Sequence, residues 1–175
     1  MKRILAFVLS LILMAGAASA EEWSDLFGGL SSLFSSNDEI TYGVGEKVEV
    51  DDLVVTLTDV MVSKGNSYYK PATGKEYVIL QFEIKNDSKE DITLSTMMNF
   101  TFWCDNTICV IDVNALATAM LSGKYQLDCA VEAGKKVTGV IGYEVPKNWE
   151  QLKVEFKKEL LFGESVTFKV DANAQ

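Results

Sequence analysis

The sequence predicts an all-β fold, a sandwich of two antiparallel β-sheets. Between residues 41 and 170, apolar and polar residues alternate in about ten short segments, the period-two pattern of half-buried strands. Turn-forming Gly, Asn, Asp and Pro residues separate these segments at regular spacing. No stretch in this range has a convincing helical periodicity. Many short strands joined by turns are typical of a sandwich.

The expected strands follow from this alternation, and Leu53, Val55, Leu57 and Met61 illustrate it by sharing one predicted face. Residues 114–122 are rich in Ala and Leu and allow a helical turn, a loop or an irregular strand. The strands are predicted at residues 47–50, 53–62, 78–85, 92–95, 98–104, 109–113, 125–131, 137–145, 152–156 and 166–170.

Two glycines, Gly139 and Gly142, fall inside one predicted strand. Glycine within a strand indicates close packing or a bulge. A phosphate-binding loop is not expected here, because no helix follows these residues.

The first twenty residues have the pattern of an export signal. Lys2 and Arg3 give a positive start, an apolar run follows from Ile4 to Met14, and Ala18-Ser19-Ala20 provides the small residues that a signal peptidase requires. The apolar run is too short to span a bilayer comfortably. We therefore expect cleavage between Ala20 and Glu21, a secreted or otherwise extracytoplasmic protein, and no stable membrane span after processing.

Three regions are predicted: a signal peptide at residues 1–20, an amphipathic extension or linker at 21–40, and a sandwich domain at 41–171. In the extension, Trp23, Phe27 and Leu30 belong to one apolar stripe at helical spacing. Gly28 and Gly29 disfavour a helix, so a short helix that orders only when docked and a flexible linker both fit. Because the polar face has no Lys or Arg, docking on protein is favoured over docking on a membrane.

The charge of the chain excludes several classes of partner. Without residues 1–20 the protein has 14 basic and 25 acidic residues, a net charge of −11. This charge repels nucleic acid and anionic lipid, so no nucleic-acid partner is expected. The sequence contains no histidine, which excludes a His-based catalytic triad and an imidazole zinc site. No cofactor or resident metal is expected.

The three cysteines, Cys104, Cys109 and Cys129, are an odd number for an exported protein. Cys104 and Cys129 lie on predicted inward faces of separate strands, which makes them the expected disulfide pair. Two alternatives remain: a Cys104–Cys109 bond across a hairpin, and three buried reduced thiols. Catalysis by a cysteine nucleophile is not expected, because there is no histidine to activate it.

Two further groups are candidates for binding. Acidic residues at predicted strand ends, namely Asp51, Asp52, Asp87, Glu90, Asp91 and Asp105, could converge on Ca²⁺, although solvated turns explain them as well. Tyr68 and Tyr69 fall in a long connection between strands, where exposed aromatic rings can stack on a sugar or hold a peptide. A tyrosine that folds back onto the sheet is the alternative.

Six short segments of the predicted domain are characteristic in their order and spacing: Tyr42–Glu46, Thr56–Val60, Gly74–Val78, Phe82–Asn86, Ala133–Lys136 and Tyr143–Pro146. Together they resemble a known family, the domain of unknown function 4352. That family occurs in exported bacterial proteins and is similar to the secreted mycobacterial immunoprotective antigen. The resemblance covers residues 41–170 and implies an immunoglobulin-like β-sandwich and an extracytoplasmic location, with no catalytic residues to carry over.

These observations favour an exported, non-catalytic binding or interaction module whose partner is a protein or a cell-envelope polymer. The expected contact residues are Tyr68 and Tyr69, or Trp23, Phe27 and Leu30 of the extension. Two classes compete with this interpretation: a hydrolase of extracellular polymers that uses a carboxylate pair, and a structural envelope protein.

We predict that the exported protein begins Glu21-Glu22-Trp23, because the Ala18 and Ala20 pair directly follows the apolar run. N-terminal sequencing of protein recovered from outside the cytoplasm measures this. Intact Met1 on protein from a membrane fraction would contradict the prediction.

Overall fold

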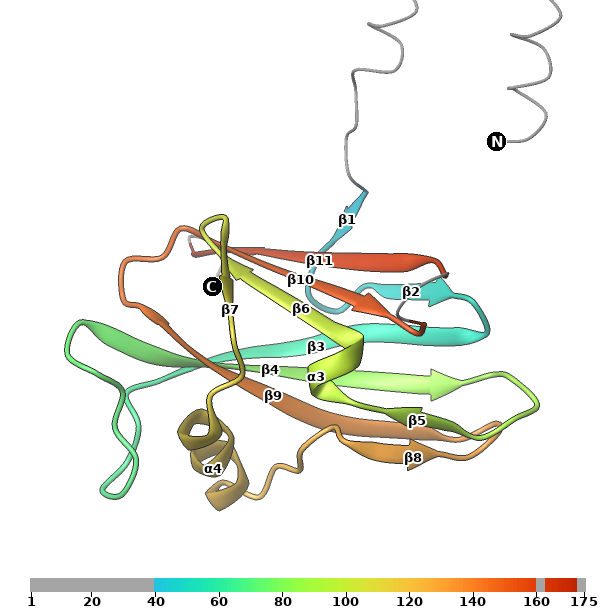
Figure 1. The fold of residues 1–175 in the computed structure, drawn as a ribbon, viewed down its shortest axis with the longest axis horizontal. Coiled ribbons are helices and arrows are strands. Elements are labelled where there is room, and N and C mark those ends of the chain that lie inside the picture. The colour runs from blue at the N-terminus through green and yellow to red at the C-terminus, as the bar shows by residue number, and fades with distance from the viewer. Residues whose placement is uncertain (1–39, 160–162, 173–175) are drawn as a thin grey trace, which may run out of the picture. The chain divides into compact units, whose positions relative to one another are not determined.

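The computed structural model describes residues 40–159 and 163–172, and these residues form two facing sheets with a small third one (Figure 1). Neighbouring strands are antiparallel, apart from the parallel pair β1 and β11. This arrangement confirms the predicted immunoglobulin-like sandwich. The first sheet has the order β1 (Thr41–Tyr42), β11 (Ser165–Asp171), β10 (Gln151–Lys157), β6 (Phe100–Cys104) and β7 (Thr107–Cys109); the second has β2 (Lys47–Val50), β3 (Leu53–Ser63), β4 (Lys75–Asn86) and β9 (Lys136–Pro146); the third pairs β5 (Ile92–Leu94) with β8 (Cys129–Val131).

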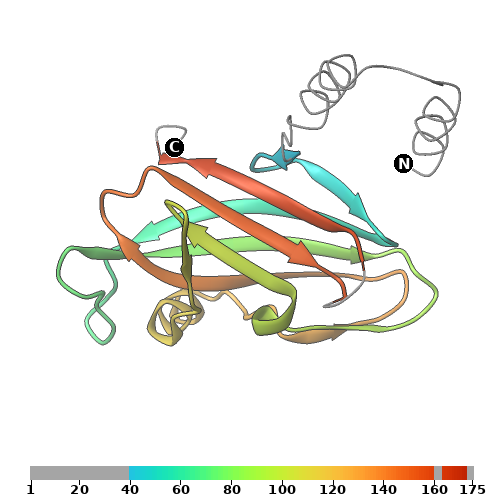
Figure 2. The same ribbon diagram turned by 45° about the horizontal axis from the view of Figure 1, so that its top comes forward.

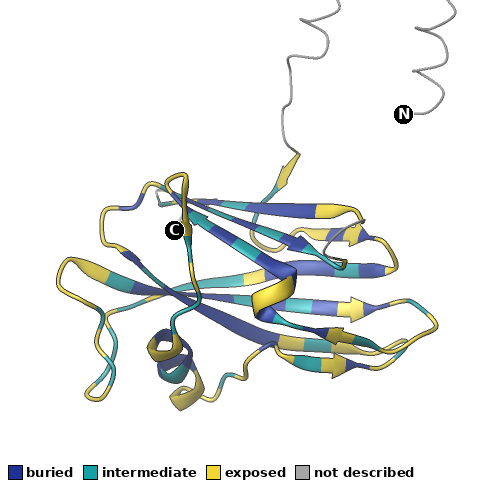
Figure 3. Ribbon diagram, viewed as in Figure 1, coloured by how far each residue is buried: buried dark blue, intermediate teal, exposed yellow. Residues whose placement is uncertain are grey.

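The hydrophobic core fills the space between the first and second sheets, and β10 and β11 cross in front of β3 and β4 in Figure 2. Aromatic rings from both sheets meet there. Phe82 of β4 lies with its ring centroid 5.1 Å from that of Phe100 and 5.8 Å from that of Phe168. The dark strand segments of Figure 3 alternate with lighter ones as the sequence pattern requires. Each buried aromatic side chain contributes about 1.5–3 kcal/mol through the water it excludes.

A β-bulge between Leu57 and Asp59 reverses the faces of the sheet to which the following side chains of β3 point. Because a shift of one residue exchanges the two faces of a strand, Val60 packs against the main core and Met61 does not. Met61 packs instead on the outer side of the second sheet. The prediction that Met61 shares a face with Leu57 is therefore wrong.

Two helices interrupt the predicted series of strands, α3 (Thr96–Asn99) and α4 (Val113–Leu121). The prediction that the domain lacks helices, and that residues 98–104, 109–113 and 125–131 are full strands, needs correction. Met98 belongs to α3, so β6 begins only at Phe100, and β7 ends at Cys109. Of residues 125–128, only Gln126 takes part in sheet pairing, through an isolated bridge to Val140. Asp112 caps α4, because its Oδ1 accepts hydrogen bonds from the backbone N of Asn114 and Ala115 at 2.9 and 2.8 Å.

The helix α4 covers the outer face of the second sheet, where it packs on β9. Leu116 and Ala119 form a second apolar cluster with Ile79 and Val140. Contact is close because of Gly142, where an added Cβ would lie 2.8 Å from both the Ala115 Cβ and the Leu116 N. At Gly139 an added Cβ would lie 2.8 Å from the Leu127 Cα. The close-packing interpretation of both glycines is confirmed.

Buried Asn86 holds the end of β4 to the third sheet. Its Nδ2 donates to the carbonyl oxygens of Glu90 and Val131 at 2.8 and 3.0 Å, and its Oδ1 accepts from Ser88. A buried amide with its donors and acceptors paired fixes a turn firmly. The loop after β4 is therefore tied to β8.

We predict that Gly142→Ala lowers the free energy of unfolding by about 1–3 kcal/mol, because α4 must move away from β9 to admit the methyl group. Urea denaturation followed by circular dichroism measures this. Gly43→Ala is the matched control, since its Cβ would meet only the Glu46 carboxylate at 3.7 Å. A loss no larger than that of the control would show that the contact between α4 and β9 is loose.

Candidate functional site

The candidate site is an apolar groove where β7 parts from β6. β7 pairs with β6 only at Phe102, Trp103 and Cys104. The chain then crosses to the second sheet, where Ile111 bridges Tyr143 of β9, and it continues into α4 (Figure 1). Among the strands that the structure describes, none consequently lies beside Phe100 and Thr101 of β6 on this side. The groove, called here the β6–β7 groove, has a volume of about 620 Å³ and is lined by Thr96, Met97, Phe100, Thr101, Phe102, Ile108, Cys109, Val110, Ile111, Val113, Leu116, Gln126, Asp128 and Tyr143.

Local sequence explains why the chain turns away at this point. Asp105 and Asn106 both have positive φ, 46° and 65°, which gives the two-residue turn of a tight hairpin. The Asp105 carboxylate also accepts hydrogen bonds from the backbone N of Glu150 and Gln151, so the turn is held against β10. The hairpin turn is fixed on β10 of the first sheet, and the capped start of α4 is fixed on β9 of the second sheet. The segment between them has to bridge the two sheets.

The floor of the groove is aromatic and reaches the core. Phe102 and Tyr143 stack with their ring centroids 3.9 Å apart and their planes at 9°. Both side chains are buried, and burial raises the pKa of Tyr143 above its usual value. The Tyr143 phenol therefore stays neutral at physiological pH.

The rim of the groove exposes large apolar side chains. Met97 of α3 is 83% exposed and Val110 is 82% exposed, and Ile108 and Val113 are exposed as well. In Figure 3 the exposed colour of α3 stands beside buried segments of β6. Several exposed apolar residues around one concavity indicate an interaction site, whereas single ones do not.

One carboxylate, that of Asp128, lies on the lining of the groove. Its Oδ1 accepts a hydrogen bond from the Thr96 N at 2.9 Å, and its Oδ2 accepts from the Thr96 Oγ1 at 2.6 Å and from the Gln126 Nε2. Burial raises the pKa of Asp128, but these donated hydrogen bonds outweigh it, so the pKa lies below the usual value. The groove thus presents a fixed negative charge at neutral pH.

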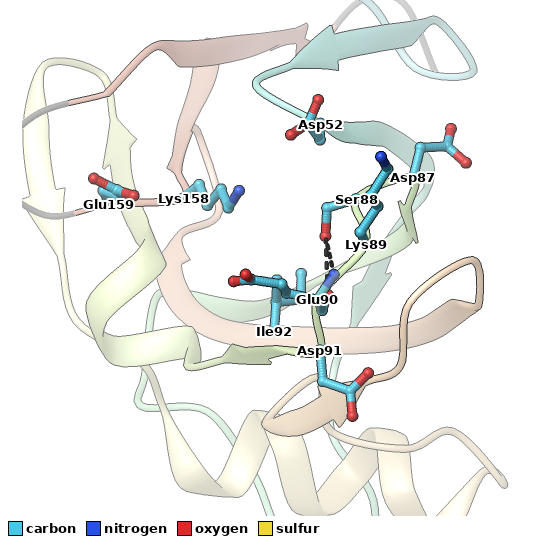
Figure 4. A pocket seen from close by; sticks show the side chains of 9 residues that line it. All are labelled: Asp52, Asp87, Ser88, Lys89, Glu90, Asp91, Ile92, Lys158 and Glu159. Carbon is cyan, nitrogen blue, oxygen red and sulfur yellow. Dashed lines mark hydrogen bonds between the residues drawn. The ribbon is translucent and has the colours of Figure 1, made fainter.

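Four of the six acidic residues predicted to converge lie around a different hollow, which we call the acidic hollow (Figure 4), whereas Asp51 is not on its lining. It has a volume of about 440 Å³ and is lined by Asp52, Asp87, Ser88, Lys89, Glu90, Asp91, Ile92, Lys158 and Glu159. The carboxylates of Asp87 and Asp91 point away from each other in the figure. Asp87 pairs with Lys85 at 2.6 Å, and Asp91 accepts from the Ala133 N at 2.9 Å.

Within the described part of the chain, no three acidic or cysteine side chains are placed to hold a metal ion. Asp105 lies apart from the hollow, in the turn between β6 and β7. The alternative of solvated turn residues accounts for these acids.

The two predicted contact tyrosines differ in exposure. Tyr68 is 85% exposed, whereas Tyr69 is half-buried. The Asn66 carboxamide accepts hydrogen bonds from the backbone N of both residues, at 2.8 and 2.9 Å, and holds the loop in a turn. Tyr68 remains a predicted contact residue, but it is not on the lining of the β6–β7 groove. Ala20, Glu21, Trp23, Phe27 and Leu30 lie outside the described residues.

The predicted Cys104–Cys129 disulfide is not present, because Cys104, Cys109 and Cys129 are all free. Cys129 lies in β8, which pairs with β5 in the separate third sheet, at the margin of the core. Cys104 and Cys109 share one face of the β6–β7 hairpin as diagonal neighbours, since Cys109 lies opposite Phe102. Burial raises the pKa of Cys104 to about 12, with a further contribution from Asp105, and burial also raises the pKa values of Cys109 and Cys129.

The groove itself was not predicted from the sequence. The alternating pattern puts Met97, Val110 and Val113 in or beside strands and gives no reason to expect them at one opening. One signal was present: residues 108–111 are apolar without alternation, which a strand with one face in water does not explain.

Comparisons with known proteins agree with the fold. A family model described as "Domain of unknown function (DUF4352)" matches residues 42–169. The yjhA protein of Bacillus subtilis has a similar structure with a TM-score of 0.58 at 19% identity, over 75% of this chain and 100% of that one. A conserved hypothetical protein of Bacillus anthracis gives 0.53 at 17% identity, over 74% and 99%.

A third similar structure is ycdA of Bacillus subtilis, a candidate lipoprotein, with a TM-score of 0.58 at 21% identity. The match covers 73% of this chain and 38% of that protein, so ycdA is much the longer of the two. No curated protein matches the sequence.

We predict that iodoacetamide at pH 8 alkylates Cys109 and Cys129 before Cys104, because only the thiolate reacts, the pKa of Cys104 is about 12, and Cys104 is buried whereas the other two are partly exposed. Mass spectrometry of peptides from a labelling time course measures this. The Cys104 rate should rise about tenfold for each pH unit. Early labelling of Cys104 at pH 8 would show that β7 detaches from β6 in solution.

Proposed function

The chain belongs to the family described as "Domain of unknown function (DUF4352)", and we propose that it is an exported, non-catalytic binding module whose binding surface is the β6–β7 groove. The observation that carries this proposal is a concave surface whose rim exposes apolar side chains, above the buried stacked pair Phe102 and Tyr143. Such a surface is costly to leave in water unless something covers it.

The size and lining of the groove support binding. Ligand sites are usually concave, largely apolar and about 300–1,000 Å³ in volume, with a few polar groups that fix orientation. The groove falls within this range, and Thr96, Gln126 and Asp128 supply the polar groups. The acidic hollow has no comparable apolar surface, since Ile92 is the one apolar residue on its lining.

An extracytoplasmic location is supported by the signal sequence at residues 1–20 and by the likeness to ycdA, a candidate lipoprotein. Among the residues that the structure describes, no helix is long and apolar enough to cross a membrane. A domain with this signal would meet its partner outside the cytoplasm. Cell-envelope polymers and proteins are the partners available there.

The proposal predicts that Val110→Asp weakens binding of an apolar probe at the groove. Nile red, which is uncharged, should bind the protein without residues 1–20 and gain fluorescence. The variant should weaken that binding at least about fivefold, because a carboxylate in an apolar groove must lose water. Fluorescence titration measures the affinity.

Val44→Asp is the matched control, since Val44 is also an exposed valine and lies outside the groove. Equal Nile red binding by both variants and the unaltered protein, each shown to be folded by circular dichroism, would refute the groove as the binding surface.

A further inference from the structure

We propose that the β6–β7 groove binds an extended peptide segment of a partner protein, with apolar side chains packed against the exposed apolar residues of the rim, such as Met97 and Val110, and a lysine or arginine placed at Asp128. This inference rests on the proposed function and adds the chemistry of the partner. It follows from three features: the strand position that β7 leaves empty, the apolar floor, and the sign of the charge.

The backbone edge favours an extended chain. If β7 continued past Cys109, Val110 would lie opposite Thr101 and Ile111 opposite Phe100, but Ile111 bridges Tyr143 instead. The groove therefore takes up the place of a longer β7, beside a stretch of β6 with which no described strand pairs on this side. A peptide added to such an edge gains main-chain hydrogen bonds, and its alternate side chains face the same surface.

The charge of the lining favours a cation. Asp128 is the one charged residue among the groove residues, and its carboxylate is held in place by Thr96 and Gln126. Lys75, which interacts electrostatically with Cys109 on the groove lining, is paired with Glu144 at 2.9 Å. The whole chain is acidic as well, so its field attracts basic partners and repels acidic ones.

The same argument disfavours the chain's own extension as the occupant. Residues 21–39 include Glu21, Glu22, Asp25, Asp38 and Glu39 and contain no Lys or Arg. Their apolar stripe suits an apolar floor, but they offer nothing to pair with Asp128. We therefore assign the groove to a separate, basic partner segment.

Selection from a displayed library of random nonapeptides tests this assignment without knowledge of the partner. The protein without residues 1–20 is the bait, and binders to Val110→Asp are removed by counter-selection. Enriched peptides should alternate apolar residues and carry Lys or Arg in place of Asp or Glu. Selected peptides lacking a preference for basic residues would overturn the inference while leaving the groove as a binding surface.

The role of Asp128 is measured with one selected peptide carrying a neutral fluorophore. Fluorescence anisotropy should show about threefold to tenfold weaker binding to Asp128→Asn, with affinity restored in Asp128→Glu. Asp87→Asn removes the same charge at the acidic hollow and should leave the affinity unchanged. Equal weakening by both neutral variants would attribute the effect to net charge and overturn the assignment to Asp128.

Two further measurements separate the other occupants. N-methylation of alternate peptide amides should weaken binding if the main chain pairs with β6, and unchanged affinity would overturn the extended mode. A synthetic peptide of residues 21–39 should not compete. Effective competition by that peptide, or a dimer in sedimentation velocity that Val110→Asp dissociates, would assign the groove to this chain instead. If neither Nile red nor any peptide binds in a way that Val110→Asp weakens, the proposed function is refuted together with this inference.

Discussion

The stacking of Phe102 on Tyr143 joins the first and second sheets where the chain leaves β7 and crosses to β9. Phe102 comes from β6 and Tyr143 from β9, so this contact fixes the separation of the sheets beside the crossing segment. Stacked aromatic pairs contribute about 0.5–1.5 kcal/mol beyond their buried area. The same two rings form the floor of the groove, so stability and the candidate function depend on one interaction.

The exposed apolar residues of the rim result from how the chain crosses between sheets. The Asp105–Asn106 turn is held on β10, and Asp112 begins α4 against β9, which leaves Ile108 and Val110 on a segment with no cover. Most of the protein follows the expected agreement of local pattern with burial. Places where that agreement fails are often functional, because natural sequences keep such exposure for a reason.

The acids of the protein separate into two arrangements with different chemical capacity. Around the acidic hollow, Asp87 and Asp91 are engaged by Lys85 and by the Ala133 N, and the carboxylates point apart. At the groove, Asp128 stands alone beside apolar surface and keeps its charge through hydrogen bonds. A single oriented charge next to an apolar floor selects for a ligand with both properties, which a scattered acidic surface cannot do.

By itself the sequence determined the acidic charge, the alternation that produces the sandwich, and the tight packing at Gly139 and Gly142, and it predicts an export signal. These depend on local pattern or on composition, and each can be read without knowing the partners of a strand. The tertiary structure decided the bulge that turns Met61 outward, the helix at Val113–Leu121, the free cysteines and the groove. The groove brings together α3, β6, β7, α4 and β9, some of which are distant from one another in sequence. Period-two alternation cannot predict such a site, because it indicates which face of a strand a residue occupies but not where the strand ends or which element packs opposite it.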